Sequence, residues 1–381
     1  MQSKTRHLML WKNDPLLYFF KEKLRFSSLD IVLCLTGAVA IAVFGLGWIA
    51  DYSYAGSGIR FIEPAFYSQM LAFFVFGLSI AVGFYVWQPG AIVHVLKSLE
   101  QTGVIQAVSE LGSKHIKSYP DFLIQLQAAI DSRKWAVIST VFALGFCAFE
   151  ALVALPATFH MFGRSAFWYD VRWFRVVVLA AFFVWLYVIF MISLKLLQAI
   201  LYFNRLFQWF DVRIRPLHPD EAGGLGALGS LTWKTSLTIV GVGAAAAVYS
   251  VIDWLAGANP LARPDLLIFW ASYILATPIS LIVPMLSAHR AMQQARNEKL
   301  NEIAQEFDKT LSDAGVTKTG DADAIKKANE KLQELQTRYE IVATSLPTWP
   351  IPARLFRNFS ITASLPLLSG LASMVINFAT K

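Results

Sequence analysis

Six long runs of predominantly apolar residues constrain the fold more than any other feature of the sequence. They cover residues 29–50, 67–95, 135–158, 175–200, 233–256 and 265–287. A helix needs about 20 apolar residues to cross the hydrocarbon core of a bilayer, so each run can span it. Closed barrels are excluded, because their strands alternate apolar and polar residues whereas these runs are continuously apolar. The sequence therefore predicts an all-α, polytopic membrane helix bundle of six or seven transmembrane helices.

The charged residues support the same class of protein. They make up 15% of the chain, whereas soluble domains carry about 25%. The net charge of +7 raises the question of nucleic acid binding, but the basic excess sits in loops beside the apolar runs, as in membrane proteins. We therefore expect the lipid bilayer, and no nucleic acid, as a partner. Cys34 and Cys147 both lie inside apolar runs and are predicted to be packed thiols.

The distribution of Lys and Arg predicts the orientation. If the N-terminus is cytoplasmic, most basic residues fall in the inner segments 1–28, 96–134, 201–232 and 288–355. The short outer loops hold few, which satisfies the positive-inside rule. The charged stretch before Ile31 marks the first run as a membrane anchor rather than a signal peptide. We predict a multipass protein of the bacterial inner (cytoplasmic) membrane with its N-terminus inside.

The region 288–345 is predicted to be a cytoplasmic antiparallel helical hairpin. Its second half carries a heptad seam typical of a coiled coil, formed by Ile325, Ala328, Leu332, Leu335, Tyr339 and Val342. Its first half offers an apolar face formed by Leu300, Ile303, Phe307 and Leu311. The hairpin packs on its own chain, or it contacts a second subunit or a cytoplasmic protein. The remaining domains are a cytoplasmic segment 1–28, a six-span bundle 29–287 and a C-terminal membrane helix 346–381.

Within that last domain, segment 356–378 is as long as the other runs but more polar, and it contains Pro366. At about 100° per residue, one face gathers uncharged polar side chains. They are Asn358, Thr362, Ser369, Ser373, Asn377 and Thr380. Such a stripe can line a water-filled path, which makes the first five of these residues, up to Asn377, pore-lining candidates. The alternative is close helix packing, which small residues and hydroxyls also favour. The segment either spans the membrane or lies at its interface.

The loop 213–229 contains the most distinctive local sequence. It includes a literal GxGxxG, but a dinucleotide site requires a βαβ unit, and apolar helices flank this one. His218, Asp220 and Glu221 could ligate a divalent cation, since two carboxylates and an imidazole suit one. The alternative is that Asp220 caps the next helix while Gly223 and Gly224 allow close packing.

Two stretches carry a resemblance to a known group. The run Pro216-Leu217-His218-Pro219-Asp220, followed by Gly223-Gly224-Leu225, resembles a motif of uncharacterised bacterial multipass membrane proteins. The later Pro347-x-Trp349-Pro350, ahead of a C-terminal apolar helix, is similar to theirs too. The resemblance implies a bacterial inner-membrane protein and carries no established activity.

Charged residues inside membrane spans are candidates for function. Glu150 lies well within the third run and Asp253 near the outer end of the fifth. Lys195 is close enough to the inner end of the fourth run to extend its ammonium to the interface. No catalytic motif is present, so we expect neither an enzyme nor a cofactor.

These features predict, first, a homo-oligomeric ion channel whose C-terminal helix lines the path. With seven spans and extended inner helices, the architecture is similar to that of insect gustatory-receptor-type channels. The alternative is a membrane scaffold or sensor that recruits a cytoplasmic partner through residues 288–345. A proton- or ion-coupled transporter using Glu150 is the third hypothesis.

Overall fold

The computed structural model describes residues 8–54, 64–154, 171–215, 218–220, 222–255, 263–316, 322–350, 357, 361–366 and 368. In this part of the chain, six helices are long and apolar enough to cross a membrane, which confirms the prediction of a membrane helix bundle. They are Ser28–Ala50, Tyr67–Gln101, Tyr119–Ala154, Arg172–Trp209, Gly226–Ile252 and Pro264–Asp313.

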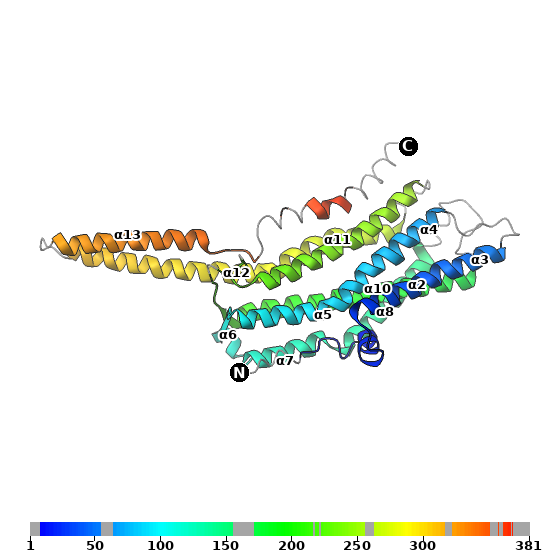
Figure 1. The fold of residues 1–381 in the computed structure, drawn as a ribbon, viewed down its shortest axis with the longest axis horizontal. Coiled ribbons are helices and arrows are strands. Elements are labelled where there is room, and N and C mark those ends of the chain that lie inside the picture. The colour runs from blue at the N-terminus through cyan, green and yellow to red at the C-terminus, as the bar shows by residue number, and fades with distance from the viewer. Residues whose placement is uncertain are drawn as a thin grey trace.

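Several spans combine α-helical and π-helical segments. The first consists of α2 (Ser28–Ala40), η3 (Ile41–Gly45) and α3 (Leu46–Tyr54); the second of α4 (Pro64–Met70), η5 (Leu71–Gly77) and α5 (Leu78–Gln101). The third consists of α7 (Tyr119–Ile130), α8 (Arg133–Phe149) and η6 (Glu150–Ala154). The others are α10 (Arg172–Trp209), α11 (Gly226–Leu255) and α12 (Pro264–Val316). They lie roughly along one axis, and α8, α5 and α12 pack against α10 (Figure 1).

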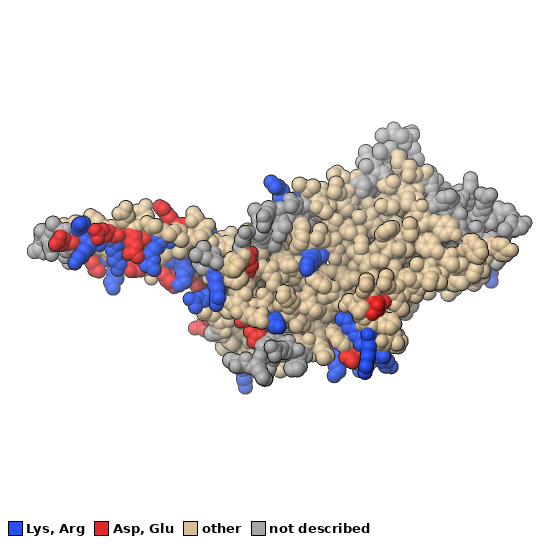
Figure 2. Space-filling view, in the orientation of Figure 1, with Lys and Arg blue, Asp and Glu red and all other residues tan. Residues whose placement is uncertain are grey.

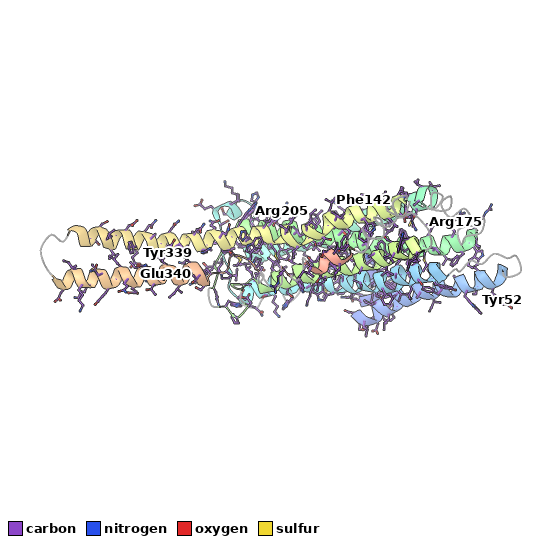
Figure 3. All side chains as sticks on the ribbon, turned by 90° about the horizontal axis from the view of Figure 1, so that it is seen from above. Tyr52, Phe142, Arg175, Arg205, Tyr339 and Glu340 are labelled. Atoms are coloured by element: carbon purple, nitrogen blue, oxygen red, sulfur yellow. The ribbon has the colours of Figure 1, made fainter. Side chains whose placement is uncertain are left out.

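The helix α12 extends far beyond the bundle. Its last part, from about residue 288, and the returning helix α13 (Ala322–Ser345) form a projection that we call the arm (Figure 1). Of the predicted seam, Leu335 is buried, whereas Ile325 and Tyr339 are about half exposed. The helices α12 and α13 pack together, and Lys331 forms an ion pair with Glu306 at 3.1 Å. We call the end of the bundle from which the arm projects the arm end, and the opposite end the far end. Arg205 lies at the arm end, whereas Tyr52 and Arg175 lie at the far end (Figure 3).

The segment after α13 is attached to α12. The Nδ1 atom of His289 lies 2.5 Å from the carbonyl oxygen of Thr348, and its ring stacks on Trp349 with centroids 4.1 Å apart. Further along, Tyr273 on α12 donates a hydrogen bond to the carbonyl of Ala363, which packs with Val240 and Leu281. The described part of segment 356–378 therefore lies against α11 and α12.

A small sheet joins two loops at the arm end, where the sequence predicted only helices. Strands β1 (Ile105–Val108) and β2 (Phe210–Val212) pair antiparallel, with Ile105 opposite Val212 and Val108 opposite Phe210. Together with the short helix α6 (Glu110–Ser113) they cover an apolar cluster that includes Phe122 and Leu225. Asp131, which precedes the predicted third run, separates α7 from α8 with φ −95° and ψ 46°.

The N-terminal region folds back onto the bundle. Its helical turn α1 (Pro15–Tyr18) and the π-helical η2 (Phe19–Lys23) bury Leu17 and Phe20 in the same apolar cluster as the spans. Charges are concentrated on the arm and the adjoining face, while most of the visible body lacks them (Figure 2). That separation is expected where lipid surrounds the body and water surrounds the arm.

Candidate functional site

An elongated cavity of about 420 Å³ lies within the membrane-spanning part, between α8, α10, α11 and α12. Its walls are mainly aromatic and aliphatic. Phe73 lies at their centre, with ring centroids 5.6 Å from Phe182 and 4.4 Å from Trp185. Small-molecule sites typically have about 300–1,000 Å³ and predominantly apolar walls with a few polar groups. The cavity therefore has the size and lining of a site for an apolar or amphiphilic molecule.

Three charged side chains line this cavity, namely Glu150, Arg263 and Asp265. Arg263 is 4% exposed and its guanidinium pairs with the Asp265 carboxylate. It also donates a 3.0 Å hydrogen bond to the hydroxyl of Tyr249 and lies over that ring. Asp265 neutralises Arg263, so Glu150 adds a second carboxyl group beside an ion pair that is already formed.

Glu150 is 6% exposed, and its side chain lines the cavity. Burying a carboxyl group is costly unless it is paired or hydrogen bonded, so the site favours a positively charged or hydrogen-bond-donating group beside it. The local sequence places each of these charges at the start of a helical segment. Glu150 begins the π-helical turn η6, and Arg263 precedes the proline at which α12 starts, with Asp265 in its first turn.

A second polar cluster is buried midway along the bundle, where the N-terminal region packs against α5 and α10 (Figure 1). The Nζ atom of Lys195 on α10 lies 2.6 Å from Oδ2 of Asp14, and the two side chains are 2% and 0% exposed. The hydroxyl of Tyr85 on α5 donates a 2.5 Å hydrogen bond to Oδ1 of Asp14. The same oxygen caps α1 by accepting from the backbone N–H groups of Leu16 and Leu17. The charge of Asp14 is therefore fully paired and hydrogen bonded, as a buried carboxylate requires.

The neighbouring residue extends this attachment to the third span. The backbone N–H of Asn13 donates to the carboxylate of Asp131 at 3.0 Å, and its side-chain amide donates to the carbonyl of Asp131 at 2.9 Å. Asn13 and Asp14 thus join the N-terminal region to three spans. This cluster corrects the prediction that Lys195 extends to the interface: its ammonium is buried within the protein.

The loop before α11 is organised around Asp220. Its carboxylate accepts hydrogen bonds from the N–H groups of Ala222, Gly224 and Gly226 at 2.8–3.0 Å. Gly226 is the first residue of α11, so one of these bonds caps the helix and the other two hold the loop. Burial acts to raise the pKa of Asp220, but these three N–H groups and His218 outweigh it, so the pKa lies below its usual value. Gly223 and Gly224 have φ of +66° and +100°, which favour glycine.

Other predicted residues are not brought together. The Nδ1 atom of His218 lies 2.7 Å from Oδ1 of Asp220. The described residues contain no group of three or more potential metal ligands. Glu221 and the side chain of Asp253 lie outside the described residues, as do four of the pore-lining candidates, Asn358, Ser369, Ser373 and Asn377. Thr362 is described and half-buried in the segment against α11 and α12. The charges that do meet at the cavity are Glu150 and the Arg263–Asp265 pair, of which the sequence singled out Glu150 alone.

Two sequence signals point to the residues that were missed. Asp14-Pro15 is a helix start, with an N-cap aspartate and proline at the first helical position, and apolar residues follow it. Arg263-Pro264-Asp265 is a second such start at the head of the sixth span. Neither signal shows that these charges are buried, since burial depends on which helices surround them.

The fold and the cavity define a multipass α-helical membrane protein. Comparison with protein-family models, with curated proteins and with solved structures finds no match for this chain.

Proposed function

We propose that the chain is a membrane-embedded sensor or scaffold that couples a ligand in the intramembrane cavity to a protein partner at the arm. The observation that carries this proposal is the continuity of α12. One helix runs from Pro264 to Val316. Its first part lines the cavity from Asp265 to Ala276, and its last part forms half of the arm.

The ligand that fits the cavity is an amphiphile with an apolar body and a cationic head. The aromatic and aliphatic walls suit the apolar body, because they offer it almost no hydrogen-bond partners. Glu150 suits the cationic head, because a charge-assisted hydrogen bond would satisfy its buried carboxylate. A fatty acid of the same length would place a third carboxyl group beside Glu150 and Asp265 and should bind less well.

The helix α12 has a place to bend between the cavity and the arm. Pro278 and Pro284 lie inside it, beyond the last cavity residue on that helix and before the arm begins. Proline removes a backbone hydrogen bond and clashes with the preceding turn, so helices bend at such positions. A small change of angle there displaces the end of the arm through a large distance.

The arm suits a protein partner. Several of its apolar side chains are about half exposed, namely Leu311, Ile325, Tyr339 and Ile341. They lie among charged residues on a projection outside the apolar body (Figure 2). If the N-terminus is inside, as the positive-inside rule predicts, this surface faces the cytoplasm and is available to a cytoplasmic partner or a second copy of the chain.

The coupling can be measured with dodecylamine as the probe. Spin labels would be placed at the exposed positions Gln208 and Glu334, in protein whose native Cys34 and Cys147 are replaced by Ala. We expect dodecylamine to shift the distribution of label–label distances measured by double electron–electron resonance. An unchanged distribution at a saturating probe concentration would contradict the coupling.

Two matched variants test whether the cavity is responsible. Ser272 lines the cavity and its neighbour Ala271 does not, although both are exposed. The shift should persist in Ala271→Trp and disappear in Ser272→Trp, whose indole would occupy the cavity. Glu150→Gln should weaken dodecylamine binding about tenfold, the usual scale for losing one charge-assisted hydrogen bond. The pore hypothesis stays a prediction, because Thr362 alone among its five residues lies in the described part.

A further inference from the structure

A second cavity, of about 390 Å³, lies where the N-terminal region meets α5 and α11. Its lining differs from that of the intramembrane cavity, because it is rich in basic and hydroxyl groups. Lys21 comes from η2, Ser28 from the start of α2, His94 from α5, and Ser230 and Lys234 from α11. Side chains from four separate helical segments therefore line this one cavity.

The two lysines are held by aromatic rings rather than by carboxylates. The Nζ atom of Lys21 lies 5.4 Å from the ring centroid of Trp11, and that of Lys234 lies 5.2 Å from the ring centroid of Trp87. Both rings also line the cavity. Among the ion pairs of the described residues, neither lysine takes part in one. Their positive charge is therefore available to a bound anion.

The nearest acidic groups do not cancel this charge. Asp14 is engaged by Lys195, and Asp30 accepts the N–H of Ser27, the N-cap of α2, in a capping box. Glu22, next to Lys21, is exposed and does not line the cavity. The pKa of Lys21 is lowered by burial and by the positive charge of Lys195, which is consistent with a surplus of positive charge around it.

We propose that this cavity binds a phosphate-bearing anion, with the phosphate between Lys21 and Lys234. Hydroxyls of Ser28 and Ser230 and the imidazole of His94 supply further donors. Basic hollows between membrane helices are suited to lipid headgroups, and Ser28 marks the level at which the first span begins. The same chemistry serves a free phosphate, so the experiment must separate the two. This inference does not depend on the proposed function.

Native mass spectrometry of the detergent-purified full chain provides the test. Dioctanoylphosphatidylglycerol is the probe, and dioctanoylglycerol, which lacks the phosphate, is the reference. We expect Lys21→Gln/Lys234→Gln to weaken binding of the phosphate-bearing lipid about thirty-fold, because each lysine near a phosphate contributes about fivefold. Binding of dioctanoylglycerol should not change. Equal affinity of the variant and the unaltered protein for the phosphate-bearing lipid would overturn the proposal.

Controls separate charge from folding. Lys23, exposed on the same π-helical turn, does not line the cavity, so Lys23→Gln should bind as the unaltered protein does. Lys21→Arg/Lys234→Arg keeps both charges and should bind within a few-fold. Failure of this conservative variant together with normal binding by the glutamine variant would contradict the proposal. If inorganic phosphate at millimolar concentration displaces the lipid completely, the occupant is free phosphate; if it does not, the occupant is a lipid headgroup.

Discussion

Lys195 and Asp14 form a buried ion pair at 2.6 Å across 181 residues of sequence. The pair joins the N-terminal region to the middle of α10, and the hydroxyl of Tyr85 completes it from α5. Since water and lipid are both excluded, each charge depends on the other for its solvation. The cluster therefore acts as an attachment point that positions the N-terminal region, including Lys21, against α5 and α10.

Lys195→Met should destabilise the protein strongly, because it leaves the carboxylate of Asp14 buried and unpaired. We expect a loss of about 3–5 kcal/mol, the usual result of removing one partner of a buried pair. The measurement is the free energy of unfolding of detergent-purified protein. Asp14→Asn/Lys195→Met removes both charges and should recover much of the loss. Lys134→Met, at an exposed position, is the control and should have little effect. If Lys134→Met and Lys195→Met lost similar amounts of unfolding free energy, the role of the ion pair would be contradicted.

Tyr85→Phe should remove one hydrogen bond to the Asp14 carboxylate while keeping the ring that packs against the apolar cluster. Hydrogen bonds to charged groups contribute about 1.5–3 kcal/mol, so we expect a loss within that range. Tyr18→Phe is the matched control, since Tyr18 is 39% exposed. Thermal unfolding of the three proteins measures the difference, and unaltered stability of Tyr85→Phe would show that the hydrogen bond is not important.

Asp220→Ala should remove a cap from α11 and with it a dependence of stability on pH. The folded-state pKa of Asp220 is below its usual value, so its ionised form stabilises the fold at pH above the ordinary aspartate pKa. That stabilisation is lost as the pH falls through the folded-state pKa. At neutral pH we expect a loss of about 0.5–2 kcal/mol. Melting temperatures at pH 6 and pH 3 should differ less for Asp220→Ala than for the unaltered protein.

His289→Ala should loosen the segment between α13 and the following helix. The substitution removes the contact with the Thr348 carbonyl and the stacking on Trp349. We expect faster proteolysis between residues 346 and 350, together with a loss of about 1–2 kcal/mol for one hydrogen bond and one ring pair. Arg290→Ala, at the exposed neighbouring position, is the control. Equal cleavage rates in both variants would contradict this attachment.

Much of the membrane part could be predicted from the sequence, since continuous apolar runs identify the spans without knowledge of their neighbours. The helical spacing of apolar residues likewise predicted one apolar face on each helix of the arm, with Phe307 on the first and Leu335 on the second. The pairing of Ile105 with Val212 could not be predicted, because two short strands in separate loops carry no periodic signal of their own. The burial of Lys195 was also missed, since a lysine near the end of a span usually extends to the interface.

The sequence alone determined that this is a membrane helix bundle, because the cost of placing polar groups in lipid depends on composition and length. It also identified Glu150 as an unusual charge. Only the tertiary structure decided that Glu150 shares a cavity with Arg263 and Asp265, and that Asp14 neutralises Lys195. The reason is physical: the free energy of a buried charge depends on the groups around it, and helices distant in the sequence supply those groups.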